Sequence, residues 1–183
     1  MVDLKTLETE RLILRNFKES DLDDLYEYAK VPGVGENAGW PHHEDIESTK
    51  KILKDFIEKD EVYALVLKEK NKVIGSLGIH KTTKFKENKS DVKREIGYVL
   101  SKDYWGMGLM PEAVKAAIKY AFEELNVDVL LCGHFNFNLK SKRVIEKCGF
   151  EFYADGIYKS ESLGKTFDEK IYNITKQRYF INE

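Results

Sequence analysis

The sequence of 183 residues has little proline, no Ser- or Gly-rich stretch and no excess of one charge. Because its three prolines are isolated at positions 32, 41 and 111, neither a disordered tail nor an interdomain linker is predicted. Thirty Lys and Arg stand against 32 Asp and Glu, so the chain lacks the positive excess that most nucleic-acid binders use. We therefore expect one globular domain over residues 1–183 that binds no nucleic acid.

Long hydrophobic runs are also absent. The first residues, MVDLKTLETERL, contain no apolar signal-peptide core, and no stretch approaches the about 18 apolar residues of a membrane span. We expect a cytoplasmic protein without a membrane partner, and in that reducing compartment Cys132 and Cys148 are expected to be free, buried thiols. Four His without paired Cys spacing predict no metal site.

Hydrophobic periodicity predicts strands first in hairpins and later in strand-helix-strand units. Such an order favours an α/β fold in which a mixed sheet carries helices on both faces, a three-layer sandwich. Ser20, followed by acidic residues, is expected to cap the first helix. Strands are expected over residues 11–15, 62–67, 73–80, 94–100 and 127–135, with more strand from 150 to 175. One helix should follow Ser20, and others should cover 46–57, 113–125 and 140–147. Residues 81–89 should form a charged connection.

A glycine loop stands between the strand at 94–100 and the next helix, in the sequence YWGMGLMPE over residues 104–112. Gly106 and Gly108 let the backbone approach a ligand, and Pro111 in the first helical turn is tolerated because that position needs no amide donor. Successive amides at a helix N-terminus can bind phosphate. Neither a Walker loop nor a dinucleotide fingerprint matches, which leaves a diphosphate such as that of coenzyme A, or a turn without a ligand.

Four ordered motifs, LETERLILRNF, REIGYVL, YWGMGLMPEA and FNFNLKSKRVIEKCGF, resemble the GNAT acetyltransferases, specifically the branch of ribosomal-protein N-terminal alanine acetyltransferases. The resemblance covers nearly the whole chain. It implies a twisted, mostly antiparallel mixed sheet of about seven strands, flanked by helices on both faces. It also implies acetyl-CoA as co-substrate, without a metal. The pantetheine would lie between the splayed parallel strands 94–100 and 127–135.

The coenzyme contacts follow from the same resemblance. Trp105 stands where the family has Gln or Arg, and only Gly108 matches the loop pattern strictly, so contacts through backbone amides are favoured. Lys102, Lys142 or Arg143 are candidates for the positive charge that Met107 does not supply. Gly97 is expected to mark a bulge that opens the strand, and a free amide near Val99 would polarise the thioester. The contact residues implied are Val99, Leu100, Gly106, Met107, Gly108, Leu109, Met110, Asn138 and Ser141.

Glu95 is the first candidate for a catalytic base, because its carboxylate lies inside a strand expected to be largely buried. The resemblance places a general base there, acting through water. The alternative is a structural ion pair of Glu95 with Lys93 or Arg94. Asn138 is either an ordinary helix cap or a pantetheine ligand. Because Ile145 stands where many family members have a Tyr acid, Ser141, or a water it holds, is expected to assist the leaving thiolate.

The acceptor side is defined less sharply. Trp40, His42 and His43 follow a loop rich in Gly and Pro, where the family forms part of its acceptor pocket, although packing beneath the loop is favoured for Trp40. Residues 1–60 carry 15 acidic and 9 basic groups, which suits a cationic acceptor. The favoured acceptor is the N-terminal amine of a ribosomal protein. A small amine and a non-catalytic acyl-CoA-binding module are the alternatives, and a monomer is not distinguished from a homodimer.

Overall fold

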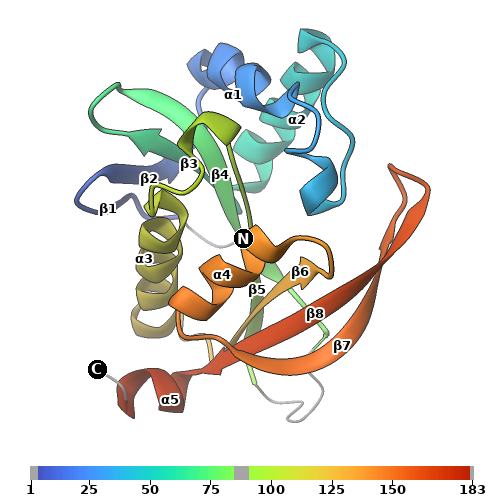
Figure 1. The fold of residues 1–183 in the computed structure, drawn as a ribbon. Coiled ribbons are helices and arrows are strands. Elements are labelled where there is room, and N and C mark those ends of the chain that lie inside the picture. Colours follow the sequence, from blue (N-terminus) through green and yellow to red (C-terminus); the bar gives the residue numbers. More distant parts are fainter. Residues whose placement is uncertain (1–3, 85–90, 182–183) are drawn as a thin grey trace.

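The computed structural model describes residues 4–84 and 91–181. A single sheet runs through these residues, and helices lie against it (Figure 1). The strands are β1 (Leu7–Glu8), β2 (Leu12–Asn16), β3 (Val62–Leu67), β4 (Lys72–Lys81), β5 (Lys93–Leu100), β6 (Val129–Phe135), β7 (Glu151–Ser160) and β8 (Lys165–Thr175). The α-helices are α1 (Leu22–Ala29), α2 (Ile46–Lys59), α3 (Leu109–Glu123), α4 (Leu139–Lys147) and α5 (Lys176–Ile181); short 3-10 turns are η1 (Glu19–Asp21), η2 (Glu36–Ala38) and η3 (Lys102–Tyr104).

The described strands follow the order β1-β2-β3-β4-β5-β6-β8-β7. All neighbours are antiparallel except β5 and β6, which are parallel. The sheet is therefore mixed and mostly antiparallel, as expected. It has eight strands in the described part of the chain rather than about seven, and the short β1, two residues long, has too little apolar sequence to be recognised by its pattern.

Helices cover both faces of the sheet, which confirms the three layers. On one face α1 and α2 pack over Ala64, Val66 and Val73. On the other face α3 supplies a continuous apolar stripe to a larger core with Leu65, Ile74 and Leu77. Since β3 and β4 are buried on both faces, their near-continuous hydrophobic runs are explained by this layering.

Several local expectations are corrected. Ser20 lies inside η1 and does not cap α1. Asp21 stands at the N-cap position of α1, but its carboxylate accepts from the Lys18 amide at 2.8 Å, before η1, and pairs with Arg15 rather than with an amide of α1. The bulge expected at Gly97 is wrong, since β4 pairs with β5 in unbroken register through that residue. Helix α3 begins at Leu109, earlier than expected. The charged connection expected over residues 81–89 lies partly outside the described residues.

The parallel pair forms a fork without a bulge. Residues Lys93 to Ile96 of β5 pair with Val129 to Cys132 of β6, and the pairing then stops. Beyond that point β5 stays paired with β4 as far as Leu100, and β6 stays paired with β8 as far as Phe135. Each strand thus keeps its outer partner while the two diverge from one another, which leaves inward-facing backbone groups available to a ligand.

Candidate active site

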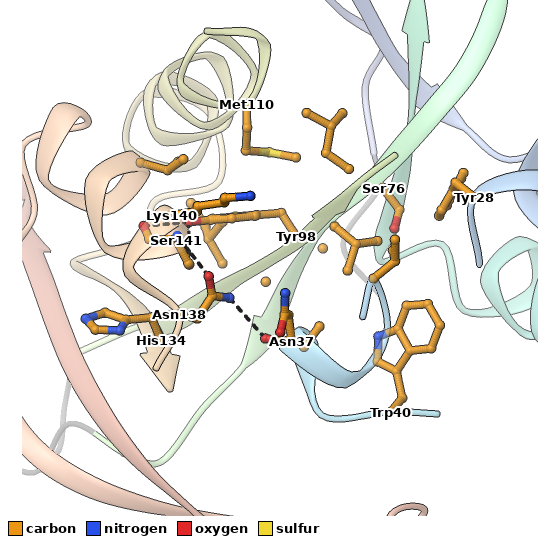
Figure 2. Close-up of a pocket in the computed structure, with 18 of the residues that line it drawn as sticks. Tyr28, Asn37, Trp40, Ser76, Tyr98, Met110, His134, Asn138, Lys140 and Ser141 are labelled. Carbon is orange, nitrogen blue, oxygen red and sulfur yellow. Dashed lines mark hydrogen bonds between the residues drawn. The ribbon is translucent and has the colours of Figure 1, made fainter. Parts of the chain in front are cut away.

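A large cavity of about 1420 Å³ opens at this fork. Its walls come from the ends of β5 and β6, the loop before α3, the start of α4 and the segment between α1 and α2, and Figure 2 shows a part of them. Of the site residues expected from the sequence, Met107 is outside the lining; its side chain is 55% exposed. The others lie together on the wall: Trp40, His42, His43, Glu95, Val99, Leu100, Gly106, Gly108, Leu109, Met110, Asn138 and Ser141.

The glycine loop adopts a conformation that depends on glycine. Gly106 and Gly108 have φ of 80° and 75°, in the left-handed region that disfavours a side chain. Gly108 is the N-cap of α3, and the amides of Leu109 and Met110 open the helix, where no preceding turn supplies acceptors. Pro111 follows as the third helical residue. The loop therefore presents backbone donors and a positive helix end to the cavity.

Two side chains fix the conformation of this loop by hydrogen bonds. The Trp105 indole N–H donates to the Leu100 carbonyl at 2.8 Å, which ties the loop to the end of β5. The Arg11 guanidinium donates to the Met107 carbonyl at 2.9 Å and pairs with Glu112 at 2.7 Å. Trp105 thus has a structural role at the position where the family has Gln or Arg, and Arg11 is the cation bound to the loop backbone.

Basic side chains at the cavity come mainly from α4. Arg143 lines the cavity together with Lys140 and Lys147, and the Lys140 ammonium lies 4.1 Å from the centre of the Trp105 ring. Two other candidates are engaged elsewhere: Lys102 donates to the Pro32 carbonyl, and Lys142 pairs with Glu146 at 3.5 Å. Arg143 is accordingly the expected cation that remains available to a phosphate.

The backbone amides of β5 point alternately toward β4 and toward the fork. The Ser101 amide donates to the Ile74 carbonyl of β4 at 2.8 Å, so alternation turns the Val99 amide toward β4 as well. The Val99 carbonyl likewise faces Gly75 of β4 closely. The amides turned toward the fork are therefore those of Tyr98 and Leu100, the residues before and after Val99, near which a free amide was expected.

The start of α4 combines capping with a polar contact to β5. Asn138 accepts from the Ser141 amide at 3.2 Å, the ordinary capping bond, and donates to the Asn37 carbonyl at 3.3 Å (Figure 2). The Ser141 hydroxyl lies 2.9 Å from that of Tyr98. Burial raises the pKa of Tyr98, so its phenol is neutral and can donate. Tyr98 and Ser141 are 43 positions apart, so no local sequence pattern identifies this contact.

Glu95 is engaged by neither Lys93 nor Arg94 in the contacts of the described residues. Its carboxylate accepts from Lys84 Nζ at 2.7 Å and from Thr82 Oγ1 at 3.1 Å. Lys84 also pairs with Glu169 of β8 at 2.5 Å. In place of the alternative ion pair with Lys93 or Arg94, Glu95 therefore belongs to a cluster with Lys84, which follows β4, and Glu169 of β8.

The segment between α1 and α2 positions the expected acceptor residues. Trp40 packs against the α1–α2 core, as favoured, and also lines the cavity. His42 Nδ1 lies 2.7 Å from Glu36. His43 Nδ1 lies 2.8 Å from Thr49, and burial lowers the pKa of His43. The His42 imidazole is thus tied to Glu36 of the same segment, and the His43 imidazole to α2.

Glu36 fixes this segment electrostatically. Burial opposes its ionisation, but the His42 ring and the backbone amides of Gly33 and His42 donate to it, so its pKa falls to about 2.

The segment also contacts the β7–β8 hairpin, through a hydrogen bond of 2.7 Å from the Ser160 hydroxyl to the Gly39 carbonyl. A Cβ at Gly39 would meet the Tyr158 ring at 2.6 Å. Residues 121 positions apart therefore form one wall.

Other buried groups at the cavity are the His134 imidazole and the Cys132 thiol. His134 is 6% exposed, and its ring nitrogens lie 2.9 Å from the Phe135 carbonyl and 3.4 Å from the Tyr172 hydroxyl. Cys132 and Cys148 are free and buried, as expected, and burial raises the pKa of both thiols. Within the described residues no group of three or more His, Cys, Asp or Glu is arranged to hold a metal, and no helix is long and apolar enough to cross a membrane.

Comparison with known proteins agrees with this geometry. The family model of the acetyltransferase (GNAT) domain matches residues 11–151. The uncharacterized N-acetyltransferase p20 of Bacillus licheniformis is 25% identical over 183 residues, which cover 96% of this chain and 99% of that protein. These matches extend over the glycine loop, the fork and α4 together.

Solved structures share the fold at lower identity. A GNAT-family acetyltransferase from Bacillus anthracis has a TM-score of 0.81 at 24% identity, over 94% of this chain and 99% of that one. A ribosomal-protein-S5-alanine acetyltransferase from Vibrio fischeri gives 0.73 at 22%, over 94% and 97%. A spermidine N-acetyltransferase from Vibrio cholerae, in complex with CoA and spermine, gives 0.75 at 17%, over 94% and 99%. The chain belongs to the GNAT family of acetyltransferases and is an N-acetyltransferase.

Proposed function

We propose that this protein transfers the acetyl group of acetyl-CoA directly to a primary amine, with both substrates bound at once. The observation that carries the proposal is the fork between β5 and β6, which opens beside the N-terminus of α3 and has Glu95 on β5 where pairing ends. A bound thioester and an amine could thus meet in one continuous cavity.

The residues around the fork fit coenzyme A. The amides from Gly106 to Met110 would hold the pyrophosphate, assisted by Arg143. The Tyr98 and Leu100 amides would bind the pantetheine arm, and the one nearest the acetyl carbonyl would polarise it. When bound, the coenzyme supplies the activated acetyl group. The chain supplies the hydrogen-bond donors that hold the coenzyme in position.

Glu95 would serve as the base. An α-amine has a pKa of about 7.7 to 8.0 and is largely protonated at neutral pH, so a proton must leave before nitrogen attacks the carbonyl. A water next to Glu95 would carry that proton to the carboxylate, which the Thr82 hydroxyl holds in place. The new C–N bond forms as the C–S bond breaks.

Ser141 would deliver a proton to the leaving sulfur, and Tyr98 would orient its hydroxyl. The 2.9 Å contact between the two hydroxyls supports this assignment. We expect Ser141→Ala to lower kcat about tenfold, and Tyr98→Phe to lower it less, with the Kd of coenzyme A unchanged in both. Rapid-mixing kinetics of thiol release would measure the step; full turnover in Ser141→Ala would remove Ser141 from the mechanism.

The N-terminal α-amine of a protein, ribosomal by resemblance, is the acceptor we favour. Two observations support it: the similarity to the Vibrio fischeri acetyltransferase named for a ribosomal protein, and the net charge of −6 on residues 1–60, from 15 acidic and 9 basic groups, which would attract a basic protein. A small cationic amine is the second candidate, favoured by the likeness to the spermidine acetyltransferase and by the enclosed wall that Ser160 closes.

One experiment tests both the activity and the acceptor. The protein is incubated with acetyl-CoA and a pool of basic N-terminal peptides and small amines, while thiol release is followed and products are identified by mass spectrometry. Acetylation of α-amines supports the favoured acceptor, and acetylation confined to small amines supports the second. Coenzyme binding without thiol release for any acceptor would contradict the transferase proposal and support a binding module.

A further inference from the structure

A lysine ammonium of the chain lies between two carboxylates in the cavity. Lys84 follows β4, Glu95 lies on β5 and Glu169 on β8, and all three line the cavity. Lys84 Nζ is 2.7 Å from Glu95 and 2.5 Å from Glu169, and 5.9 Å from the centre of the Tyr158 ring. The arrangement is the one that an external primary ammonium would need.

Glu169 has capacity for one more donor. Its side chain is only 5% exposed, and its Oε2 has no hydrogen-bond partner within the described structure. A buried carboxylate oxygen without a donor is costly, so a ligand N–H there would be stabilising. Gly133 makes room for the group, because a Cβ at that position would meet Glu169 Oε1 at 2.7 Å.

The charges of the cluster also favour a cation. Lys84 is one positive group beside two carboxylates, which leaves one negative charge. Burial alone would lower the pKa of Lys84, but the charge of Glu95 and the hydrogen bonds of both carboxylates outweigh it and raise that pKa. The site therefore stabilises a primary ammonium even in partly desolvated surroundings.

We propose that Glu95 and Glu169 together form the subsite for the acceptor's primary ammonium, and that Lys84 occupies this subsite as an internal competitor until the acceptor displaces it. The proposal rests on the proposed function and adds to it the recognition of the amine. It makes Glu169 a residue that binds the acceptor, whereas Glu95 both binds and deprotonates it. It also means that acceptor affinity is reduced by the fraction of time that Lys84 holds the subsite.

The test measures binding of a simple ammonium rather than turnover. n-Butylammonium is titrated into the full chain at pH 8 and followed by NMR, with the Lys84 ε-carbon signal and the amides of residues 131–134 as probes. Tetramethylammonium is the comparison cation, since it carries the same charge without N–H donors. Lys84→Met and Glu169→Gln are the variants. Lys81→Met and Asp168→Asn are their controls, because Lys81 and Asp168 are exposed residues near the same positions in the chain.

We expect n-butylammonium, but not tetramethylammonium, to move the Lys84 signal of the unmutated protein toward that of an exposed lysine. Lys84→Met should bind n-butylammonium about tenfold more tightly, if Lys84 holds the subsite about nine-tenths of the time. Glu169→Gln should bind it about tenfold more weakly, as loss of a charged hydrogen bond predicts. The control variants should match the unmutated protein.

Three results would overturn the proposal: equal effects of the two cations, unchanged or weaker binding in Lys84→Met, or unchanged binding in Glu169→Gln. The first needs no variant, so it holds even where a substitution impairs folding. These outcomes are separate from the proposed function. If the protein transfers acetyl but its affinity for n-butylammonium is the same in the Lys84 and Glu169 variants, this inference alone is overturned. If n-butylammonium binds as expected but no acetyl is transferred, the transferase proposal alone is overturned.

Discussion

The two halves of the cavity are built in different ways. The half proposed to bind the coenzyme consists of a glycine loop, the first turn of α3 and the start of α4, each formed by residues close together in the chain. The half proposed to bind the acceptor joins the α1–α2 segment, Lys84, Glu95 and the β7–β8 hairpin, through contacts such as that of Ser160 with Gly39. The proposed coenzyme half is therefore built mainly from local chain geometry, with Arg11 as a distant support, whereas the proposed acceptor half exists only once the sheet has assembled.

The largest expected effect is at Glu95, where the halves meet. Glu95→Gln should lower kcat about 10²-fold or more while the Kd of coenzyme A stays the same, because a general base contributes to the reaction step and not to coenzyme binding. Steady-state kinetics and calorimetric titration would separate the two quantities. Glu58→Gln on the exposed face of α2 is the control. A kcat within twofold of the unmutated protein would remove Glu95 as the base.

The next effect should be confined to the coenzyme half. Gly108→Ala places a side chain at φ of 75°, which costs about 1–2 kcal/mol, and relaxation of the loop should weaken coenzyme A binding about tenfold. Gly164→Ala in the β7–β8 turn has a comparable backbone cost at φ of 60° and should leave that Kd unchanged. Calorimetric titration measures both. Equal losses of affinity would mean that the loop acts through stability alone.

A smaller effect should be confined to the acceptor half. Ser160→Ala removes the hydrogen bond that holds the hairpin to Gly39. We expect the KM of the acceptor to rise about threefold to tenfold, in keeping with about 1 kcal/mol for one hydrogen bond, without a change in the Kd of coenzyme A. The exposed Thr166→Ala in the same hairpin is the control. A shift in coenzyme affinity instead would show that the halves are coupled.

The smallest effect concerns the stability of the acceptor segment at low pH. Because the pKa of Glu36 is lowered in the folded protein from its ordinary value of 4.5 to about 2, its ionised form stabilises the fold above about pH 4.5, and this contribution is lost as the pH falls through 2. Since Glu36 is partly exposed, we expect about 1 kcal/mol after solvent screening. Denaturant unfolding of Glu36→Gln should show a stability lower by this amount at pH 6, with the difference vanishing near pH 2. A difference independent of pH would exclude the ionic contribution.

Expectations held where residues act through their neighbours in the chain. The turn at Gly106 and Gly108, Pro111 in the first turn of the next helix and the Asn138 cap follow from residue type and local spacing. The sequence did not identify side-chain partners that lie far apart in the chain. The alternative interpretation paired Glu95 with Lys93 or Arg94 by adjacency, but Arg94 lies on the opposite face of the strand. The partners of Glu95 come from elsewhere in the fold: Lys84 from the segment after β4, which also binds Glu169 of β8.

The sequence by itself determined the layered fold and singled out the glycine loop, the Asn138 cap and Glu95, because hydrophobic period, glycine content and helix capping are local properties of the chain. The tertiary structure alone decided that β5 and β6 diverge after Ile96 without a bulge, that Tyr98 reaches Ser141, and that Glu169 and Lys84 surround Glu95. Such contacts depend on strand register, and register is set by the packing of the whole sheet.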